Sequence, residues 1–288
     1  MPTEYSEIND ELFDELDRFK QLPIDVVPTP YPTWNHMCRD EGGGLGLARG
    51  WYIVYGARTG TGKSIMALNL AVHAFKLGER VGFISLEMSL PQLVTRSMGI
   101  FSGISIKRLE HGKDYLPRDA QTVKTDWAGQ KKRTNGTIWL NPDPVSELDQ
   151  LKEVFRDMVL TKRCRFILID YLQLVWTGNA RQILDRITEV SGMIRRLTKV
   201  WNVTTVALSQ FNREGSRSEN PPVPTDLMGG SPLENDADQV VLLDHTSVKD
   251  HGDGYEYKIL LAKNRHGETG WFPALFDRRT LRITEHRP

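Results

Sequence analysis

Cysteine, long apolar runs and an excess of charge of either sign are all scarce in this chain of 288 residues. The two cysteines, Cys38 and Cys164, lie far apart and form no CxxC pair, which excludes a disulfide framework and a cysteine zinc site and favours a reducing compartment. The longest apolar run, 166–176, is too short to span a bilayer and contains Asp170. Residues 1–20 are acidic and lack the apolar core of a signal peptide. We therefore expect a soluble, cytoplasmic protein without a membrane partner.

Charge is balanced: lysine and arginine number 37, as do aspartate and glutamate, so the formal net charge is zero. Global charge therefore gives no support for nucleic-acid binding, and a surface for DNA has to be a local patch. The hydrophobic content of 39% and the charged content of 26% are ordinary for a folded globular protein. The length suffices for one large α/β domain with appendages or for two small domains.

What the chain does have is a glycine-rich loop between the apolar run 51–55 and a helix expected from Lys63 to about Leu77. Glycines let backbone N–H groups turn toward a polyphosphate, and the helix dipole favours its negative charge. Lys63 is expected to reach the β- and γ-phosphates of a nucleotide, and Ser64 to ligate Mg²⁺. The residues expected to bind the nucleotide are Gly56, Ala57 (where this motif usually has glycine), Arg58, Thr59, Gly60, Thr61, Gly62, Lys63 and Ser64.

The rest of the chain predicts strands that alternate with helices, followed by a run of closing strands. Strands are expected at 81–86, 137–140, 164–176, 202–210, 237–244, 255–265 and 271–277, and helices at 89–110 (interrupted at Gly99 and Gly103), 145–161 and 182–200. The basic cluster of Lys131, Lys132 and Arg133 is expected in a solvated turn, and 211–231 is expected to be a long loop. This order indicates an α/β fold with a mostly parallel twisted sheet, flanking helices and an antiparallel edge.

The N-terminal residues 1–32 are expected to form an arm separate from a domain over 33–288. Residues 4–22 have the spacing of an amphipathic helix, and the prolines that follow predict a stiff extended connector. Such a helix either lies on its own domain or packs on a neighbouring subunit. Disorder or a separate partner is the remaining alternative.

Three polar side chains each lie at or near the carboxyl end of an expected parallel strand: Glu87, Asp170 and Gln210. Open α/β sheets bind ligands beyond the carboxyl ends of their strands, so these residues are expected to gather around one nucleotide. Asp170 is expected to hold Mg²⁺, directly or through water. Glu87 is the candidate general base for the attacking water, and Gln210 is suited to sensing the γ-phosphate at the head of the 211–231 loop.

Six segments, GARTGTGKS, ISLEMS, ILIDYLQL, ALSQFNR, PLENDADQVV and AKNRHGETG, resemble in this order the ATPase domain of DnaB-like replicative DNA helicases, a branch of the RecA-like fold. The resemblance runs from about Thr33 to Ile283. It implies an ATP-dependent helicase or translocase that encircles single-stranded DNA as a hexameric ring and unwinds duplex in replication. Because only the 32-residue arm precedes the expected domain, a short form without the family's N-terminal collar domain is expected, bacterial or phage-encoded.

The resemblance also implies roles for individual residues. Lys63 and Ser64 would bind phosphate and Mg²⁺, Glu87 would be the catalytic glutamate, Asp170 the metal-organising aspartate, and Gln210 the residue that couples nucleotide to DNA. Lys263 and Arg265 correspond to finger residues that act across the subunit boundary, so ATP would lie between subunits of the ring. The implied partners are single-stranded DNA, further copies of the chain, and a helicase loader or primase.

Two loops, about 176–181 and 211–231, would line the channel for DNA by the same resemblance. The candidate contacts to DNA phosphates are Arg181, Arg213, Arg217, Gly229, Gly230 and Ser231. Trp176 is either a stacking platform or a core residue at a strand end, and the core is favoured. Two other functions stay open: a RecA-like DNA-dependent ATPase in recombination or an accessory role without unwinding, and a nucleotide-gated binding ring with little turnover.

Overall fold

The computed structural model describes residues 25–38, 45–110, 117–141, 144–178 and 182–286. The strands of its large sheet are β3 (Tyr52–Ala57), β4 (Arg80–Ser85), β5 (Thr137–Leu140), β6 (Phe166–Asp170), β7 (Thr204–Gln210), β8 (Gln239–Asp250), β9 (Gly254–Asn264), β10 (Gly270–Asp277) and β11 (Ile283–Glu285). The helices are α2 (Pro32–Met37), α3 (Lys63–Lys76), α4 (Leu90–Ser102), α5 (Ile106–Glu110), α6 (Pro117–Thr134), α7 (Leu148–Leu160), α8 (Ile183–Val200), α9 (Arg213–Arg217) and α10 (Gly230–Asp236).

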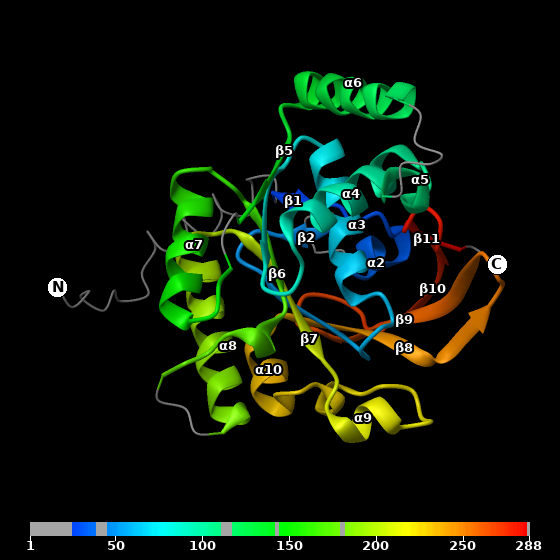
Figure 1. The fold of residues 1–288 in the computed structure, drawn as a ribbon. Helices are drawn as coiled ribbons and strands as arrows, with labels where there is room; N and C mark the ends of the chain where they lie inside the picture. Colours follow the sequence, from blue (N-terminus) through cyan, green and yellow to red (C-terminus); the bar gives the residue numbers. More distant parts are fainter. Residues whose placement is uncertain (1–24, 39–44, 111–116, 142–143, 179–181, 287–288) are drawn as a thin grey trace, which may run out of the picture.

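The sheet has the order β11-β10-β9-β8-β3-β7-β6-β4-β5 (Figure 1). Strands β8, β3, β7, β6, β4 and β5 pair in parallel, whereas β9, β10 and β11 continue the sheet in antiparallel fashion. This confirms the expected mostly parallel sheet with an antiparallel edge. No helix among the described residues combines the length and the apolar character that crossing a membrane requires.

Both faces of the central strands are buried, which explains their nearly continuous apolar sequence. Alternate side chains of β3 enter different cores: Ile53 and Tyr55 pack with α2, α3 and α4, and Tyr52 and Val54 pack with α7, α8 and α10. Figure 1 shows these two groups of helices on opposite faces of the sheet. Because the central strands are parallel, their carboxyl ends lie together on one side of the sheet, called here the carboxyl edge, where a ligand site is expected.

Residues 25–31 pack on this domain. The short strand β1 (Val26–Val27) pairs with β2 (Leu47–Ala48), and the Tyr31 side chain is fully buried. The hydroxyl and the backbone N–H of Thr33 both donate to the carboxylate of Glu285. The helix expected over 4–22 lies outside the described residues, so its contact with a neighbouring subunit stays a prediction.

The strand expected over 164–176 is shorter than the apolar run suggested. β6 ends at Asp170, and a 3₁₀ turn over Leu172–Leu174 follows. Trp176, expected in the core, is 54% exposed, so that expectation was wrong. The run stays apolar because Leu172 and Val175 are buried beneath the turn, and hydrophobicity reports burial rather than the type of element.

Two segments expected to be irregular contain helices. The cluster at residues 131–133 is exposed as expected, but it lies in the last turn of α6, where cations interact favourably with the helix dipole. Trp127 attaches this polar helix to the domain by stacking on Phe75, with 4.2 Å between ring centroids. Within 211–231, α9 begins where the Asn212 side chain accepts a hydrogen bond from Gly215 N at 2.7 Å, a capping contact that the polar composition concealed.

Candidate nucleotide-binding site

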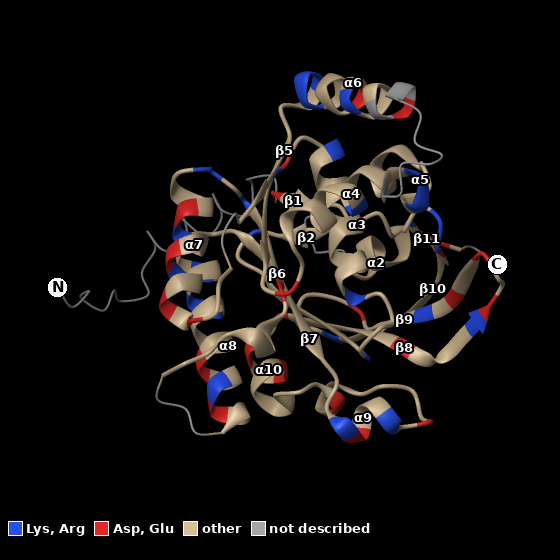
Figure 2. Ribbon diagram, in the orientation of Figure 1, with Lys and Arg blue, Asp and Glu red and all other residues tan. Residues whose placement is uncertain are grey.

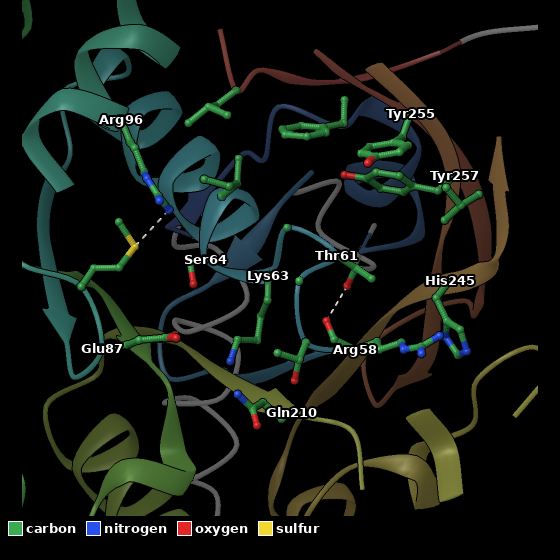
Figure 3. Close-up of a pocket in the computed structure, with 18 of the residues that line it drawn as sticks. Arg58, Thr61, Lys63, Ser64, Glu87, Arg96, Gln210, His245, Tyr255 and Tyr257 are labelled. Carbon is green, nitrogen blue, oxygen red and sulfur yellow. Dashed lines mark hydrogen bonds between the residues drawn. The ribbon is translucent and has the colours of Figure 1, made fainter. Parts of the chain in front are cut away.

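A cavity of about 1000 Å³ opens at the carboxyl edge of the sheet (Figure 3). It is lined by residues 58–65, by Glu87 just beyond β4, and by Gln210 at the end of β7. In Figure 3, Lys63 and Gln210 lie side by side, with Glu87 next to them. Asp170, at the end of β6 between these strands, is fully buried close to Lys63. The structure therefore brings together the residues that the sequence analysis assigned to one nucleotide.

Glycine is required at two points of the loop by its backbone. Gly60 and Gly62 have φ angles of 83° and 97°, a left-handed conformation that other residues adopt at a cost, and Gly62 is the residue from which α3 begins. Gly56 and Ala57, expected among the nucleotide ligands, lie in β3 and do not line the cavity. A Cβ at Gly56 would lie 2.2 Å from Leu227 Cδ2, so Gly56 permits close packing against the 211–231 segment.

Lys63 and Asp170 form a buried charged pair, with Nζ 3.8 Å from Oδ1 and exposed fractions of 8% and 0%. Neither the ammonium nor either carboxylate oxygen has a hydrogen-bond partner among the described residues. Burial lowers the pKa of Lys63 to about 8, against the opposing charges of Asp170 and Glu87. Burial likewise raises the pKa of Asp170, against the opposing effect of Lys63. Buried charged groups that lack hydrogen bonds are costly, so this arrangement fits a ligand that supplies the missing bonds.

The donor set fits Mg²⁺. Asp170 offers two buried carboxylate oxygens, and Ser64 in the first turn of α3 offers a hydroxyl that lies close enough to lower the pKa of that carboxyl group. Hard oxygen donors of this kind, together with phosphate oxygens, are what Mg²⁺ prefers. Ser64 and Asp170 thus remain the residues expected to hold the metal.

Several residues of the cavity were not foreseen. Arg96 of α4 reaches it, with Nη1 3.5 Å from Met88 Sδ. Tyr171 does not line the cavity, but the centre of its ring lies 3.6 Å from Lys63 Nζ. The far end is aromatic and is lined by Tyr255, Tyr257 and Phe276 from β9 and β10. The only sequence signal for Tyr171 was its place directly after Asp170, and no local pattern indicated the others, which come from distant segments.

The expected finger residues lie on the opposite side of the sheet from the cavity, next to the amino ends of the parallel strands. Because β9 runs antiparallel to β8, its last residue, Asn264, pairs with Gln239 at the start of β8. Lys263 Nζ donates to the backbone oxygen of Glu234, and Arg265 Nη2 donates to that of Asn235 at 2.5 Å. Neither finger residue lines the cavity of its own chain.

A buried carboxylate, Asp238, contacts the loop directly after β9 that contains Arg265 and His266, here called the finger loop. Its Oδ2 accepts a hydrogen bond from Tyr52 N at 2.8 Å and lies 3.3 Å from Lys199 Nζ. Its Oδ1 lies 3.7 Å from Arg265 Nη1 and 3.8 Å from His266 Nε2. The His266 ring also stacks on Trp51, with 4.5 Å between centroids. Sequence reasoning missed Asp238, which looked like one acid near the start of an expected strand.

Five of the six candidate DNA-contacting residues lie in the part of the chain that the structure describes. Arg213 and Arg217 are exposed on α9, where the ribbon in Figure 2 alternates between basic and acidic positions. Arg217 also borders a smaller hollow next to Arg58 and His245. Gly229, Gly230 and Ser231 lie at the start of α10, and Arg181 lies outside the described residues. DNA contact by these residues stays a prediction.

Residues 41–285 match the family described as the DnaB-like helicase C-terminal domain. The chain belongs to this family. The probable plasmid replicative DNA helicase of Chlamydia muridarum is 28% identical over 282 residues, which cover 97% of this chain and 57% of that protein. The replicative DNA helicase DnaB of Geobacillus stearothermophilus is also 28% identical, over 92% of this chain and 59% of that protein. The DnaB-like chain thus spans little more than half the length of these curated relatives.

Solved structures agree with the fold. A DnaB-like replicative helicase, studied with its interactions with primase, superposes with a TM-score of 0.79 at 21% identity, over 98% of this chain and 69% of its own. A solved ATPase domain gives a TM-score of 0.80 at 20% identity, over 99% of this chain and 100% of its own. These likenesses confirm the RecA-like ATPase fold that the sequence predicted for the DnaB-like chain.

Proposed function

We propose that this DnaB-like chain is the motor of an ATP-dependent helicase that encircles single-stranded DNA as a hexameric ring and unwinds duplex in replication. This proposal rests on the distance, within one chain, between the nucleotide cavity and the expected finger residue. The cavity residues Lys63, Glu87 and Gln210 lie at the carboxyl edge of the sheet, whereas Arg265 lies beside the start of β3. The two groups are thus separated by the length of β3, whose four residue steps from Ile53 to Ala57 span about 13 Å. A cavity that needs both groups is complete only when a second copy supplies the finger.

The chemistry follows from the positions of the side chains. Lys63 and the N-terminus of α3 neutralise the phosphates, and Glu87 orients the attacking water and accepts its proton. Ser64 and Asp170 would hold Mg²⁺, which would supply positive charge against the phosphates. Gln210 senses the γ-phosphate. Arg265 from the adjacent copy stabilises the phosphoryl group during its transfer. Finger arginines of this kind raise the rate of hydrolysis by about 10³–10⁵.

The role in replication and the partners rest on kinship. The curated relatives are named replicative helicases, and the solved relative was studied with primase. Binding of single-stranded DNA by segments 176–181 and 211–231, and recruitment by a helicase loader or primase, belong to the proposal. Electrostatic tracking of a strand needs only a few basic groups per subunit in a ring.

The test is ATP turnover with and without single-stranded DNA over a range of protein concentrations, with native mass recorded on the same samples. We expect the rate per subunit to rise with the appearance of a ring, to rise further with DNA, and to collapse in Arg265→Ala. The matched control is Arg195→Ala, which removes a half-exposed arginine paired with Asp236 near the same edge. A monomer that turns over at full rate and ignores DNA would refute the proposal.

Unwinding needs its own measurement. A forked duplex with one fluorescent strand should be separated by the wild type with ATP and left intact by Glu87→Gln. Turnover on DNA together with filament formation and no strand separation would indicate a RecA-like accessory ATPase. Binding of nucleotide with no turnover above that of Glu87→Gln would indicate a nucleotide-gated ring.

A further inference from the structure

Gln173 is a buried polar side chain that the proposed chemistry does not use. It lies in the 3₁₀ turn after β6, next to the end of β7, and is 7% exposed. Buried amides of this kind persist only where each polar atom has a partner. The partners of Gln173 therefore indicate what its side chain does.

The amide joins the end of β7 to the far end of the 211–231 segment. Its Nε2 donates to Ser209 Oγ and to the backbone oxygen of Met228, both at 2.8 Å. Its Oε1 accepts a hydrogen bond from the backbone N–H of Gln210 at 3.3 Å. Both donor hydrogens and the acceptor are used, so a side chain without a primary amide leaves at least one buried group unpaired.

The base of the 211–231 segment closes at the same point. Met228 N donates to the backbone oxygen of Gln210 at 2.7 Å, and Phe211 forms an isolated bridge with Leu227. Leu227 in turn packs directly on Gly56 of β3, the strand that leads into the phosphate-binding loop. Gln173 thus lies where the cavity residue Gln210 and both ends of this segment meet.

The backbone of Gln173 reaches the second candidate DNA segment. Its carbonyl oxygen accepts a hydrogen bond from Arg186 Nη2 at 3.1 Å. The Arg186 guanidinium lies 5.3 Å from the centre of the Trp176 ring, which is exposed at the start of segment 176–181. One residue therefore contacts elements that lead to both segments.

We propose that Gln173 is a positioning residue that couples occupation of the nucleotide cavity to the conformation of segment 211–231. When Gln210 moves toward or away from a γ-phosphate, its backbone N–H displaces the Gln173 amide. Because the same amide holds Met228, the base of the segment moves with it. The link to DNA rests on the proposed function, whereas the coupling itself needs only nucleotide binding.

Hydrogen exchange measured by mass spectrometry tests the coupling without DNA. The wild type with Mg²⁺ and a slowly hydrolysed ATP analogue should differ from the free protein in exchange over 211–231. Gln173→Met keeps the volume and removes the amide, so the nucleotide-dependent change should shrink by about fivefold or more, the lower range of allosteric coupling. Gln182→Met, an exposed glutamine before α8, is the matched control and should retain the change.

Each outcome decides the proposal. An unchanged nucleotide response in Gln173→Met overturns it, as does a wild type whose 211–231 segment does not respond to nucleotide. Binding of a fluorescent ATP analogue and the thermal midpoint show whether the variant is folded. If Gln173→Met does not fold, the isosteric Gln173→Glu, which loses both donors, takes its place under the same criteria.

A second arm separates the coupling from the proposed function. The readout is the ratio of ATP turnover with DNA to turnover without it, and this ratio should fall toward one in Gln173→Met. Suppose that nucleotide changes the hydrogen exchange of segment 211–231 in the wild type and not in Gln173→Met, while DNA leaves the turnover of the wild type unchanged. This result supports the coupling and overturns the helicase. A variant with the wild-type DNA ratio and exchange response overturns the coupling and leaves the helicase intact.

Discussion

Asp170 and Asp238 are both buried in the sheet but have opposite surroundings. Asp170 ends β6 at the carboxyl edge, and its oxygens have no hydrogen-bond partner among the described residues. Asp238 precedes β8 at the other edge, accepts a hydrogen bond from Tyr52, and lies within 3.8 Å of Lys199, Arg265 and His266. A buried carboxylate without hydrogen bonds persists where a ligand supplies them, whereas one that accepts hydrogen bonds from its own chain holds the local structure.

The same difference separates the two edges of the sheet. The carboxyl edge carries an open cavity with unsatisfied charges, and the opposite edge carries a finger loop whose Arg265 is tied to Asp238 and to the end of α10. We infer that the first edge is built to bind a ligand of its own chain and the second to present a fixed side chain to another copy. Substitutions at the two edges should therefore have different consequences.

The largest expected effects are those of substitutions in a site that two subunits share, and mixing two such variants tests the sharing. Arg265→Ala should lower ATP turnover by about 10³–10⁵ and Glu87→Gln by about 10²–10⁴. In a mixture, the intact Arg265 of the Glu87→Gln chain can meet the intact cavity of the Arg265→Ala chain, so the rate should exceed the sum of the separate rates. A mixture that only adds the two rates contradicts a finger that acts between copies. Arg195→Ala mixed with Glu87→Gln is the control.

Asp170→Asn should separate function from stability. Loss of metal binding removes several kcal/mol of transition-state stabilisation, or about 10²–10³ in rate. The free energy of unfolding without nucleotide should change less than in Asp238→Ala, because burial, which raises the pKa of Asp170, disfavours its charge by more than Lys63 favours it. Turnover titrated with Mg²⁺ and urea denaturation measure the two quantities. An equal loss of stability in both variants would remove the distinction between the two aspartates.

Asp238→Ala should destabilise the protein by about 1–3 kcal/mol, because Tyr52 N loses its acceptor in a buried position. Asp236→Ala is the matched control: two residues away, Asp236 pairs with the half-exposed Arg195 at 3.3 Å, and such pairs contribute about 0–1 kcal/mol. Urea denaturation compares the variants. Similar values for the two would mean that Asp238 does not anchor the finger loop.

The smallest effect concerns pH. Burial lowers the pKa of His266 below its usual 6.5, although Asp238 opposes this. Since the unfolded chain takes up the proton at a higher pH than the folded one, the folded protein should lose stability as the pH falls below 6.5. In His266→Gln this slope should be shallower, as read from thermal midpoints across the pH range. A slope equal to that of the wild type would exclude His266 as its source.

Features that depend on neighbouring residues in the chain were accessible from the sequence. The phosphate-binding loop, the start of α3, and the acids and amide at or just beyond the ends of β4, β6 and β7 lie in short segments whose pattern reports their own structure. The parallel sheet brings their carboxyl ends to one edge, so their grouping followed from the topology. The exposed Trp176, the long polar helix α6 and the helix α9 were missed because composition and apolar runs do not say which side chains find partners.

Only the tertiary structure decided which polar groups are paired and with what. Asp238 contacts Tyr52 across 186 positions of sequence, and Gln173 reaches Met228 across 55. The aromatic end of the cavity likewise comes from the antiparallel edge, far along the chain from the phosphate-binding loop. Local pattern determined the elements and the chemical groups at their ends. The satisfaction of a buried charge or amide depends on distant atoms that folding alone brings within hydrogen-bonding distance.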